Sequence, residues 1–365
     1  MILKSFKYST TDWTLDGLTL DNANLIVGKN SSGKSRALYA LRRVKSLLSQ
    51  RNTENDKSDF KTELIFIDNE NGKRRREIRL SLSISKEGKV ISESLIVNDE
   101  VKIKRERHIG KINNEDVNPP EDMLLMHVRR DVDKYDFIED IIGWSEETVI
   151  RSFIDQYHPS NDELYELVSK FTPKMRNHIV KMAKDVGFPL KDFGTFFDLF
   201  NSHGTISSKV DIESLKKVKF ILIEEENVGF ILLDDLSSGM YRTILLLILI
   251  EQLINLDRPA LIAIDDLGEG LDYSRATKVG RLLFSICEEY DIQLIATSNE
   301  EFMMNIVDIS NWNILVREGG MVKSITSEFC PEEFEDFKFS GLSNFDFFTS
   351  DFLNRMSSKL FNGDK

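Results

Sequence analysis

A glycine-rich stretch near the N-terminus restricts the folds open to this chain more than any other feature. Residues Gly28–Ser35, GKNSSGKS, match the pattern G-x-x-x-x-G-K-[S/T]. They follow a short apolar segment, Leu25–Val27, and open the stretch Lys34–Ser49, where leucine and valine recur at helical spacing. A strand, a glycine loop and a helix in this order predict an α/β fold that holds a phosphate group at the start of its first long helix. The alternative is a chance glycine turn in front of a helix.

The chemistry of the loop explains the spacing of its residues. Glycines let the backbone wrap closely around a phosphate, and successive N–H groups at a helix N-terminus supply positive potential. We expect Lys34 to reach the β- and γ-phosphates of a nucleoside triphosphate and the Ser35 hydroxyl to coordinate Mg²⁺. The predicted nucleotide-binding residues are Gly28, Lys29, Asn30, Ser31, Ser32, Gly33, Lys34, Ser35 and Arg36.

A second segment, Leu261–Ile264, has the composition of a buried strand and ends in two carboxylates, Asp265 and Asp266. A buried strand that delivers an acid at its carboxyl end is how proteins with this kind of loop hold Mg²⁺. We therefore predict that Asp265 binds the metal and that Asp266 polarises the water that attacks the γ-phosphate. The alternative is an acidic helix cap after a core strand.

Length and composition set the outer limits. With 365 residues, the chain fits one large α/β domain with an insertion, or two domains. Because no apolar run approaches 18 residues and the N-terminus lacks a signal-peptide pattern, we expect a cytoplasmic protein. Its two cysteines, Cys287 and Cys330, are then expected to be free thiols. The five histidines are scattered without metal-ligand spacing, so no zinc site is expected.

The charge of the chain argues against nucleic acid as a general partner. A net charge of −13 gives no overall attraction for phosphate backbones. Three basic clusters could nevertheless touch phosphate: Lys73–Arg76, Lys102–Arg107 and Arg129–Arg130. The alternative for each cluster is a solvated face of a strand or turn.

The pattern of apolar and polar residues changes along the rest of the chain. From Thr62 to Lys104 apolar and polar residues alternate, which predicts the antiparallel strands of a β-lobe. A polar connection, Glu106–Glu121, follows, and Tyr135–Phe200 has helical spacing. Strands and helices then alternate, which predicts a parallel sheet. The alternating elements are helix Ser238–Ile254, strand Ala260–Ile264, helix Ser274–Tyr290 and strand Gln293–Ala296. A hairpin of Lys217–Ile223 with Val228–Leu233 is predicted to precede them.

One further motif becomes informative through its position. Leu236–Met240, LSSGM, precedes a strongly apolar helix and could by itself be an ordinary helix N-terminus. It lies between the loop and the acidic strand. In this order the chain resembles the ABC-type ATPases, in the SMC/RecF-like branch that includes the overcoming-lysogenization-defect (OLD) ATPases. NLIVGKNSSGKS is similar to the phosphate loop of that branch, LSSGM to its signature motif, LIAIDDLGEGLD to its metal strand and D-loop, and LIATSNEEF to its switch strand.

The resemblance covers roughly residues 1–50 and 217–317, and it implies a mechanism shared between two subunits. Two ABC-type heads sandwich two ATP molecules with Mg²⁺, each nucleotide lying between one subunit's phosphate loop and the other subunit's signature segment. Ser237, Ser238 and Gly239 would then contact the γ-phosphate across the dimer, and Asp272 matches the D-loop aspartate. ATP binding would close the dimer and hydrolysis would open it.

Three positions depart from the pattern of the family. The family usually has glutamate after the metal aspartate, and the shorter side chain of Asp266 implies slow hydrolysis. Asn299 stands where the branch often has a switch histidine, and it can hydrogen-bond the γ-phosphate without carrying charge. The segment MLLMHVRRD resembles the strand that delivers the Q-loop glutamine, with Arg130 at or near that place.

The resemblance also organises the chain into four parts. Residues 1–130 would form the N-terminal part of the head with the loop and the β-lobe, 131–212 a helical insertion, 213–328 the C-terminal part of the head, and 329–365 a phenylalanine-rich tail. We expect the tail to pack against the head, and a docking surface for a partner is the alternative.

We therefore expect a slow regulatory ATPase that forms a homodimer or higher homo-oligomer through ATP-sandwiched heads. Chains of this build resemble the ATPase subunits of bacterial anti-phage defence systems, whose effector is a separately encoded nuclease or toxin. Two alternatives stay open. One is a RecF-like repair ATPase that binds DNA, and the other is a pseudo-ATPase scaffold that binds ATP and never hydrolyses it.

Overall fold

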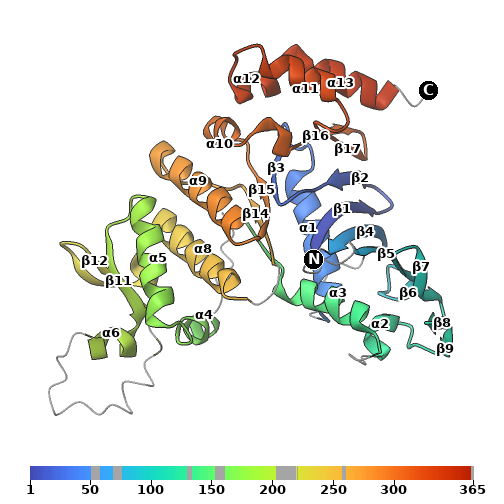
Figure 1. Ribbon diagram of the computed structural model, residues 1–365, viewed down its shortest axis with the longest axis horizontal. Coiled ribbons are helices and arrows are strands. Elements are labelled where there is room, and N and C mark those ends of the chain that lie inside the picture. The colour runs from blue at the N-terminus through green and yellow to red at the C-terminus, as the bar shows by residue number, and fades with distance from the viewer. Residues whose placement is uncertain are drawn as a thin grey trace. The chain divides into compact units, whose positions relative to one another are not determined.

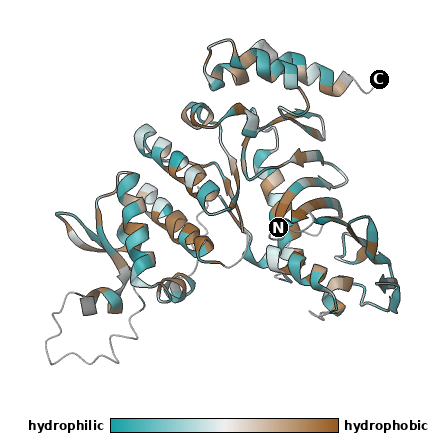
Figure 2. Ribbon diagram, viewed as in Figure 1, coloured by the Kyte–Doolittle hydropathy of each residue, from teal (hydrophilic) through white to brown (hydrophobic). Residues whose placement is uncertain are grey.

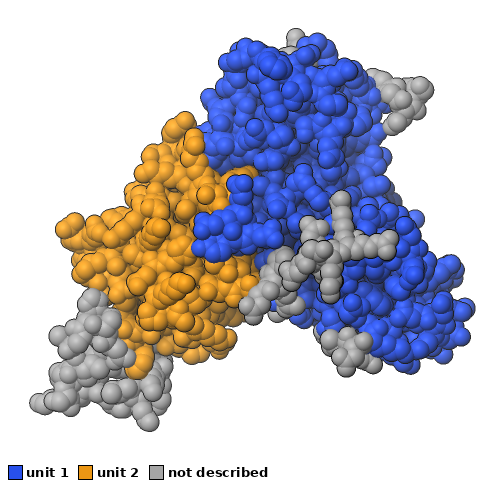
Figure 3. Space-filling model, viewed as in Figure 1, with its two compact units in different colours: residues 1–151, 258–266, 287–365 blue, residues 152–257, 267–286 orange. Residues whose placement is uncertain are grey.

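A computed structural model of the chain describes residues 1–50, 58–68, 76–129, 134–152, 161–202, 219, 221–256 and 260–362. Two compact units share the chain (Figure 3). Unit 1 consists of residues 1–151, 258–266 and 287–365, and unit 2 of residues 152–257 and 267–286. In the described part of the chain, no helix is both long and apolar enough to cross a membrane. Cys287 and Cys330 are both buried and unpaired, as predicted.

A mixed sheet of 14 strands forms the centre of unit 1 (Figure 1). Its spatial order is β10-β14-β15-β3-β16-β17-β2-β1-β4-β5-β6-β7-β8-β9. In chain order the strands are β1 (Ile2–Ser9), β2 (Thr14–Thr19), β3 (Ala23–Val27), β4 (Phe60–Asp68), β5 (Arg76–Ile84), β6 (Val90–Val97), β7 (Glu100–Glu106), β8 (Ile109–Ile112), β9 (Glu115–Val117), β10 (Val149–Ser152), β14 (Leu261–Asp265), β15 (Gln293–Thr297), β16 (Trp312–Glu318) and β17 (Met321–Ile325).

The sheet has a parallel part and an antiparallel part. Strands β14, β15, β3 and β16 pair in parallel, and strands β1 and β4 to β9 pair in antiparallel fashion. The parallel strands are almost wholly buried and apolar, as expected where both faces of a sheet are covered. This confirms the predicted α/β fold with a mixed sheet and an antiparallel β-lobe near the N-terminus. Because β3, β14 and β15 run in the same direction, their carboxyl ends meet at one edge.

The helices of unit 1 are α1 (Lys34–Leu48), α2 (Leu125–Val128), α3 (Asp136–Glu147), α10 (Glu301–Ile306), α11 (Pro331–Lys338), α12 (Asn344–Thr349) and α13 (Asp351–Asn362), with a 3₁₀ turn η2 (Ile309–Asn311). Helix α1 buries Leu38, Leu41, Val44 and Leu48, which recur every three or four residues along one face. Brown, hydrophobic residues gather on the strands of the sheet and on α8 (Ser238–Ile254) in Figure 2.

The β-lobe is longer than the sequence predicts. Strands β8 and β9 occupy the segment Glu106–Glu121, for which we predicted a polar connection. Asn113 and Asn114, with φ of 47° and 68°, form the two-residue turn between these strands. Asparagine tolerates the left-handed region that such a hairpin turn needs. The buried side chains of Ile112 and Val117 hold the hairpin to the core.

Unit 2 combines a small sheet with helices. Strands β11 (Leu190–Thr195), β12 (Ile221–Glu225) and β13 (Gly229–Leu232) pair in antiparallel order. The helices are α4 (Asn161–Val168), α5 (Pro173–Asp185), α6 (Phe196–Ser202), α8 and α9 (Tyr273–Glu289), which runs into unit 1 at residue 287, and η1 (Leu233–Asp235) is a 3₁₀ turn. The prediction of helical structure over Tyr135–Phe200 is wrong at β10 and β11. Strand β11 forms through pairing of Phe193 with the distant Ile223, which local spacing does not reveal.

The phenylalanine-rich tail folds as α11, α12 and α13. Phe334, Phe337 and Phe347 are buried against one another, with ring centroids 4.5 and 4.9 Å from Phe347, and Trp312 of β16 lies beside them. This part of the tail packs as predicted. Phe339, in contrast, is 86% exposed between α11 and α12.

Candidate functional site

The phosphate loop joins β3 to α1, and its backbone closes tightly on itself. A Cβ atom added at Gly28 would lie 2.9 Å from the carbonyl oxygen of Leu315 and 2.4 Å from Ser32 Oγ, so a larger residue would open the loop. Gly33, the N-cap of α1, has φ of 108°, a left-handed conformation that favours glycine. Both glycines of the motif are therefore required by the backbone itself.

The loop lysine lies inside the site. Lys34 is 6% exposed, and its Nζ donates a hydrogen bond of 2.8 Å to the carbonyl oxygen of Gly28. Burial lowers the pKa of the Lys34 ammonium, while the charges of Asp266 and Asp265 act to raise it. The structure thus brings the loop lysine together with both carboxylates of the acidic strand. Ser35, the next residue of α1, is exposed.

A threonine connects the ends of two neighbouring strands. Thr297, the last residue of β15, is fully buried, and its hydroxyl donates 2.5 Å to Asp265 Oδ1. The same hydroxyl accepts a hydrogen bond of 2.8 Å from the backbone N–H of Asp266. Asp266 itself has φ of 54°, which aspartate tolerates better than most residues. Thr297 therefore fixes the orientation of the Asp265 carboxylate and the turn that carries Asp266.

The donors at this edge of the sheet fit a magnesium ion. Mg²⁺ prefers hard oxygen ligands and is usually held at nucleotide sites by one or two carboxylates together with substrate phosphates. The Ser35 hydroxyl and the Asp265 carboxylate are the side chains that would hold it. The ammonium group of the adjacent Lys34 would partly neutralise the negative charge of the phosphates.

Other predicted residues surround the loop. The Nδ2 of Asn299, which follows β15, donates 3.2 Å to Oδ1 of Asn30 in the loop, so the predicted switch residue contacts the loop directly. The guanidinium of Arg36 is exposed and lies 4.8 Å from the ring centroid of the buried Trp13. Lys29 is also exposed.

Three residues of this region were not predicted from the sequence. Thr297 positions Asp265, Trp13 packs beside Gly33, and the Nη1 of Arg317 donates 3.2 Å to the carbonyl oxygen of Ser31. Trp13 and Arg317 come near the loop only because β2, β17, β16 and β3 lie side by side in the sheet. No local pattern marks them, whereas Thr297 could have been found from its place at the end of a core strand.

The predicted signature segment starts α8 in unit 2. Ser237 is the N-cap of α8 without a side-chain capping hydrogen bond, and both Ser237 and Ser238 are exposed. A Cβ at Gly239 would lie 2.9 Å from Cδ2 of Leu271. The N-terminus of α8 is thus an open helix end that presents two hydroxyls.

The predicted D-loop aspartate has a structural partner in the same unit. Asp272 Oδ1 accepts 3.0 Å from the backbone N–H of Arg275, and Oδ2 accepts 3.3 Å from its Nη1. The bond from the Arg275 N–H is the main cause that lowers the pKa of Asp272. Asp272 therefore caps the start of α9.

In residues 123–129, the part of MLLMHVRRD that the structure describes, the strand predicted to deliver a Q-loop residue is absent. The apolar run MLLMHVRRD contains the short helix α2 instead, because Glu93 binds its N-terminus: the carboxylate accepts 2.6 Å from the N–H of Leu125 and 3.1 Å from that of Met126. Arg130 lies outside the described residues.

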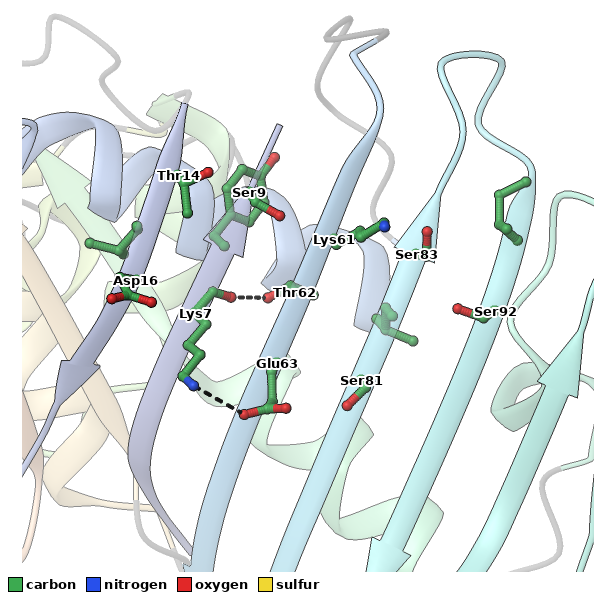
Figure 4. A pocket seen from close by; sticks show the side chains of 14 residues that line it. Lys7, Ser9, Thr14, Asp16, Lys61, Thr62, Glu63, Ser81, Ser83 and Ser92 are labelled. Atoms are coloured by element: carbon green, nitrogen blue, oxygen red, sulfur yellow. Dashed lines mark hydrogen bonds and ion pairs between the residues drawn. The ribbon is translucent and has the colours of Figure 1, made fainter. Parts of the chain in front are cut away.

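A separate hollow of about 520 Å³ lies on the outer face of the β-lobe (Figure 4). The labelled side chains lie on β1, β2, β4, β5 and β6 and are mostly hydroxyls, with the ion pair Lys7–Glu63 at 3.9 Å. The predicted nucleotide residues lie elsewhere, so this hollow is not the predicted site.

The head of an Smc protein, solved in complex with the C-terminal winged-helix domain of ScpA, is similar with a TM-score of 0.54 and 12% identity over 89% of this chain and 98% of that chain. The SMC head domain from Thermotoga maritima gives a TM-score of 0.48 and 15% identity over 89% of this chain and 99% of that chain. At 12% identity the first of these likenesses shows the fold alone. A search of curated protein sequences gives no significant match.

A family model matches residues 23–298, which include the phosphate loop, the signature segment and the acidic strand. This range is more than half of the chain. The chain is a P-loop ATPase with the fold of SMC heads, and it belongs to the family described as AAA domain, putative AbiEii toxin, type IV toxin–antitoxin system.

Proposed function

We propose that the chain is a slow ATPase that binds ATP and Mg²⁺ at the phosphate loop, dimerises head to head and regulates a separate effector protein. The observation that carries the proposal is the meeting of three strand ends. Strand β3 leads into the loop with Lys34, β14 ends in the two carboxylates, and β15 ends in Thr297, which binds to both aspartates. This is the constellation that phosphoryl transfer requires.

The side chains divide the work as follows. Lys34 exchanges the carbonyl of Gly28 for phosphate oxygens when ATP binds, and Thr297 keeps the Asp265 carboxylate oriented. Mg²⁺, when bound, neutralises charge on the β- and γ-phosphates. Asp266 orients the attacking water and accepts its proton. Its short side chain limits the rate, which suits a regulatory switch better than a fast motor.

Dimerisation is proposed from the signature segment. The N-terminus of α8 is exposed and presents Ser237 and Ser238, and an open helix end attracts anions. In the proposed dimer this segment contacts the γ-phosphate of the nucleotide held by the other copy. Asn299, which contacts Asn30 of the loop, then reports whether the γ-phosphate is present.

A role in bacterial anti-phage defence is the biological part of the proposal. The family description names a putative AbiEii toxin of a type IV toxin–antitoxin system, which supports a place among such systems. We propose that the effector is a separately encoded nuclease or toxin that responds to opening and closing of the head dimer.

The test is ATP hydrolysis by the purified chain with Mg²⁺. We expect slow phosphate release from the wild type and none from Lys34→Ala, since removing one preorganised donor to a developing charge costs about 10²–10³-fold in rate. Lys111→Ala, at an exposed lysine of β8, is the matched control and keeps the wild-type rate. Hydrolysis by Lys34→Ala at the wild-type rate would refute the site. A wild type that binds ATP tightly without turnover would favour the scaffold instead.

DNA binding is the weaker candidate, because the basic clusters are largely neutralised where the structure describes them. Arg76 pairs with Asp68 and Asp140. Burial lowers the pKa of its guanidinium, but the charges and hydrogen bonds of Asp140 and Asp68 together raise that pKa above its ordinary value. Lys102 and Lys104 pair with neighbouring glutamates of β7, and Arg105 is buried against backbone carbonyls.

A further inference from the structure

A hollow of about 710 Å³ lies beside the phosphate loop in unit 1. Its walls are the loop residues Lys29–Ser32, the end of β16 with its turn at Arg317–Gly319, and one face of the C-terminal helix α13. Ser357, Ser358 and Asn354 of α13 face this hollow. Because loop residues form one of its walls, the hollow lies next to the predicted nucleotide. Its other walls come from segments outside the loop.

Two cations line the hollow, and neither pairs with a carboxylate among the residues that the structure describes. Arg317 Nε donates 2.7 Å to the carbonyl oxygen of Gly319 and Nη1 donates to that of Ser31, so both bonds go to backbone. Across the described ranges, neither Lys29 nor Arg317 forms an ion pair, although both are exposed. Glu318 also lines the hollow, which leaves a local excess of one positive charge. The chain as a whole has a net charge of −13, so the charge of this hollow is opposite in sign to that of the whole chain.

Two acids precede the signature segment in unit 2. Asp234 and Asp235 belong to the 3₁₀ turn η1, and both are exposed. Asp235 forms no ion pair with any residue that the structure describes. It lies two residues before Ser237, a separation of at most about 7 Å along an extended chain.

We infer that Lys29 and Arg317 of one copy receive Asp235 of a second copy when the two heads close on ATP. The inference rests on the proposed function, which brings Ser237–Gly239 of the second copy to the nucleotide held at the loop. Asp235 of the second copy then lies at the edge of that nucleotide, next to Lys29 and Arg317 of the first copy. Two chains of net charge −13 repel each other, so a local pair of opposite charges is what lets these faces meet and fixes their orientation.

Charge reversal tests the pairing. With Mg²⁺ and a non-hydrolysable ATP analogue, the dissociation constant of the homodimer is measured by analytical ultracentrifugation for the wild type, Arg317→Glu and Asp235→Arg. Each reversal places like charges opposite each other at both sites of the dimer. We expect each to weaken homodimerisation at least about tenfold, and the loss to shrink at high salt.

Mixing the two variants separates a contact between copies from an effect within one chain. A heterodimer of Arg317→Glu with Asp235→Arg pairs opposite charges at both of its sites, so we expect it to form with nearly wild-type affinity. The matched control mixes Arg317→Glu with Asp185→Arg, which reverses an exposed aspartate of α5 in the same unit as Asp235. That mixture is not expected to form a tight heterodimer.

The outcomes separate this inference from the proposed function. If the wild type dimerises with the analogue but the two reversed variants do not recover on mixing, the pairing is wrong and the head dimer stands. The same holds if either single reversal dimerises like the wild type. If the wild type stays monomeric with the analogue, the head dimer fails and the pairing fails with it.

Discussion

Two helix N-termini in this molecule are predicted to bind phosphate, and they are built differently. At α1 the loop closes through Gly28 and Gly33, a buried Lys34 points back at the loop, and two carboxylates stand beside it. At α8 two serines are exposed, and the side chain of the N-cap residue Ser237 makes no capping hydrogen bond. In the function that we propose, α1 carries most of the phosphate site, whereas α8 contributes only when another copy brings the phosphate to it.

At the N-terminus of a third helix, α2, a side chain of the protein already occupies the position that an anion would take. Glu93 places its buried carboxylate on the N–H groups of α2, as a phosphate would lie on α1. The chain therefore satisfies one helix end internally and leaves the other two available.

The largest expected effect comes from the carboxylate that completes the α1 site. Asp266→Ala should lower ATP hydrolysis about 10²–10⁴-fold, the range for loss of a general base, while ATP binding is kept. Phosphate release and binding of a fluorescent ATP analogue measure the two properties. Asp192→Ala, on a strand of unit 2, is a control outside the site. If Asp266→Ala hydrolyses ATP like the wild type, the α1 site loses its proposed base.

The buried Glu93 carboxyl group at the N-terminus of α2 predicts a pH dependence of stability. Burial raises the pKa of Glu93 from 4.5 to about 7, against the backbone hydrogen bonds and Arg105, which lower it. The folded state then holds a proton that the unfolded state releases, so the free energy of unfolding falls as pH rises from about 4.5 to about 7. The expected fall is about 3 kcal/mol. Denaturant unfolding at several pH values measures it. Glu93→Gln should remove this component, and an unchanged slope in the variant would show that Glu93 is not its source.

A pair of glycine substitutions compares the two helix ends directly. Gly28→Ala forces a Cβ against the backbone oxygen of Leu315, so we expect weaker ATP binding and a stability loss of about 1–3 kcal/mol. Gly239→Ala meets the end of the Leu271 side chain at 2.9 Å, which can rotate away, and the backbone oxygen of Gly270 at 3.4 Å, which is an ordinary contact. Its monomer should therefore bind ATP as the wild type does. Calorimetric titration and thermal unfolding distinguish the variants, and an equal loss of ATP binding in both would break the comparison.

The smallest expected effect concerns the threonine that links the strand ends. Thr297→Val keeps the shape of the side chain but loses the hydrogen bonds to Asp265 and the Asp266 N–H. We expect the free energy of unfolding to fall by about 1.5 kcal/mol and the rate of ATP hydrolysis to fall roughly tenfold. Thr297→Ser restores the hydroxyl and should recover the rate. A valine variant with normal kinetics would mean that the aspartates keep their positions without it.

Features encoded in neighbouring residues were predictable, and features that depend on distant pairing were not. The loop, Asp265 and the parallel strands follow local patterns of glycine, charge and apolar runs, and the structure places Lys34 with both aspartates. The role of Thr297 and the contact of Arg317 with Ser31 depend on which strands lie side by side. The helix α2 was mistaken for a strand because an apolar run has no period, and the cap that decides it, Glu93, lies on another strand.

The most direct test of the account mixes two inactive variants. Lys34→Ala destroys the loop site, and Ser238→Glu places a negative charge at the start of α8, where it repels the γ-phosphate. Steady-state ATP hydrolysis is measured for each variant alone and for their mixture. The account predicts that each is inactive alone and that the mixture recovers activity, since a heterodimer has one intact loop facing one intact signature segment. Wild-type hydrolysis by Ser238→Glu alone, or a mixture that stays inactive, would contradict a site shared between two copies.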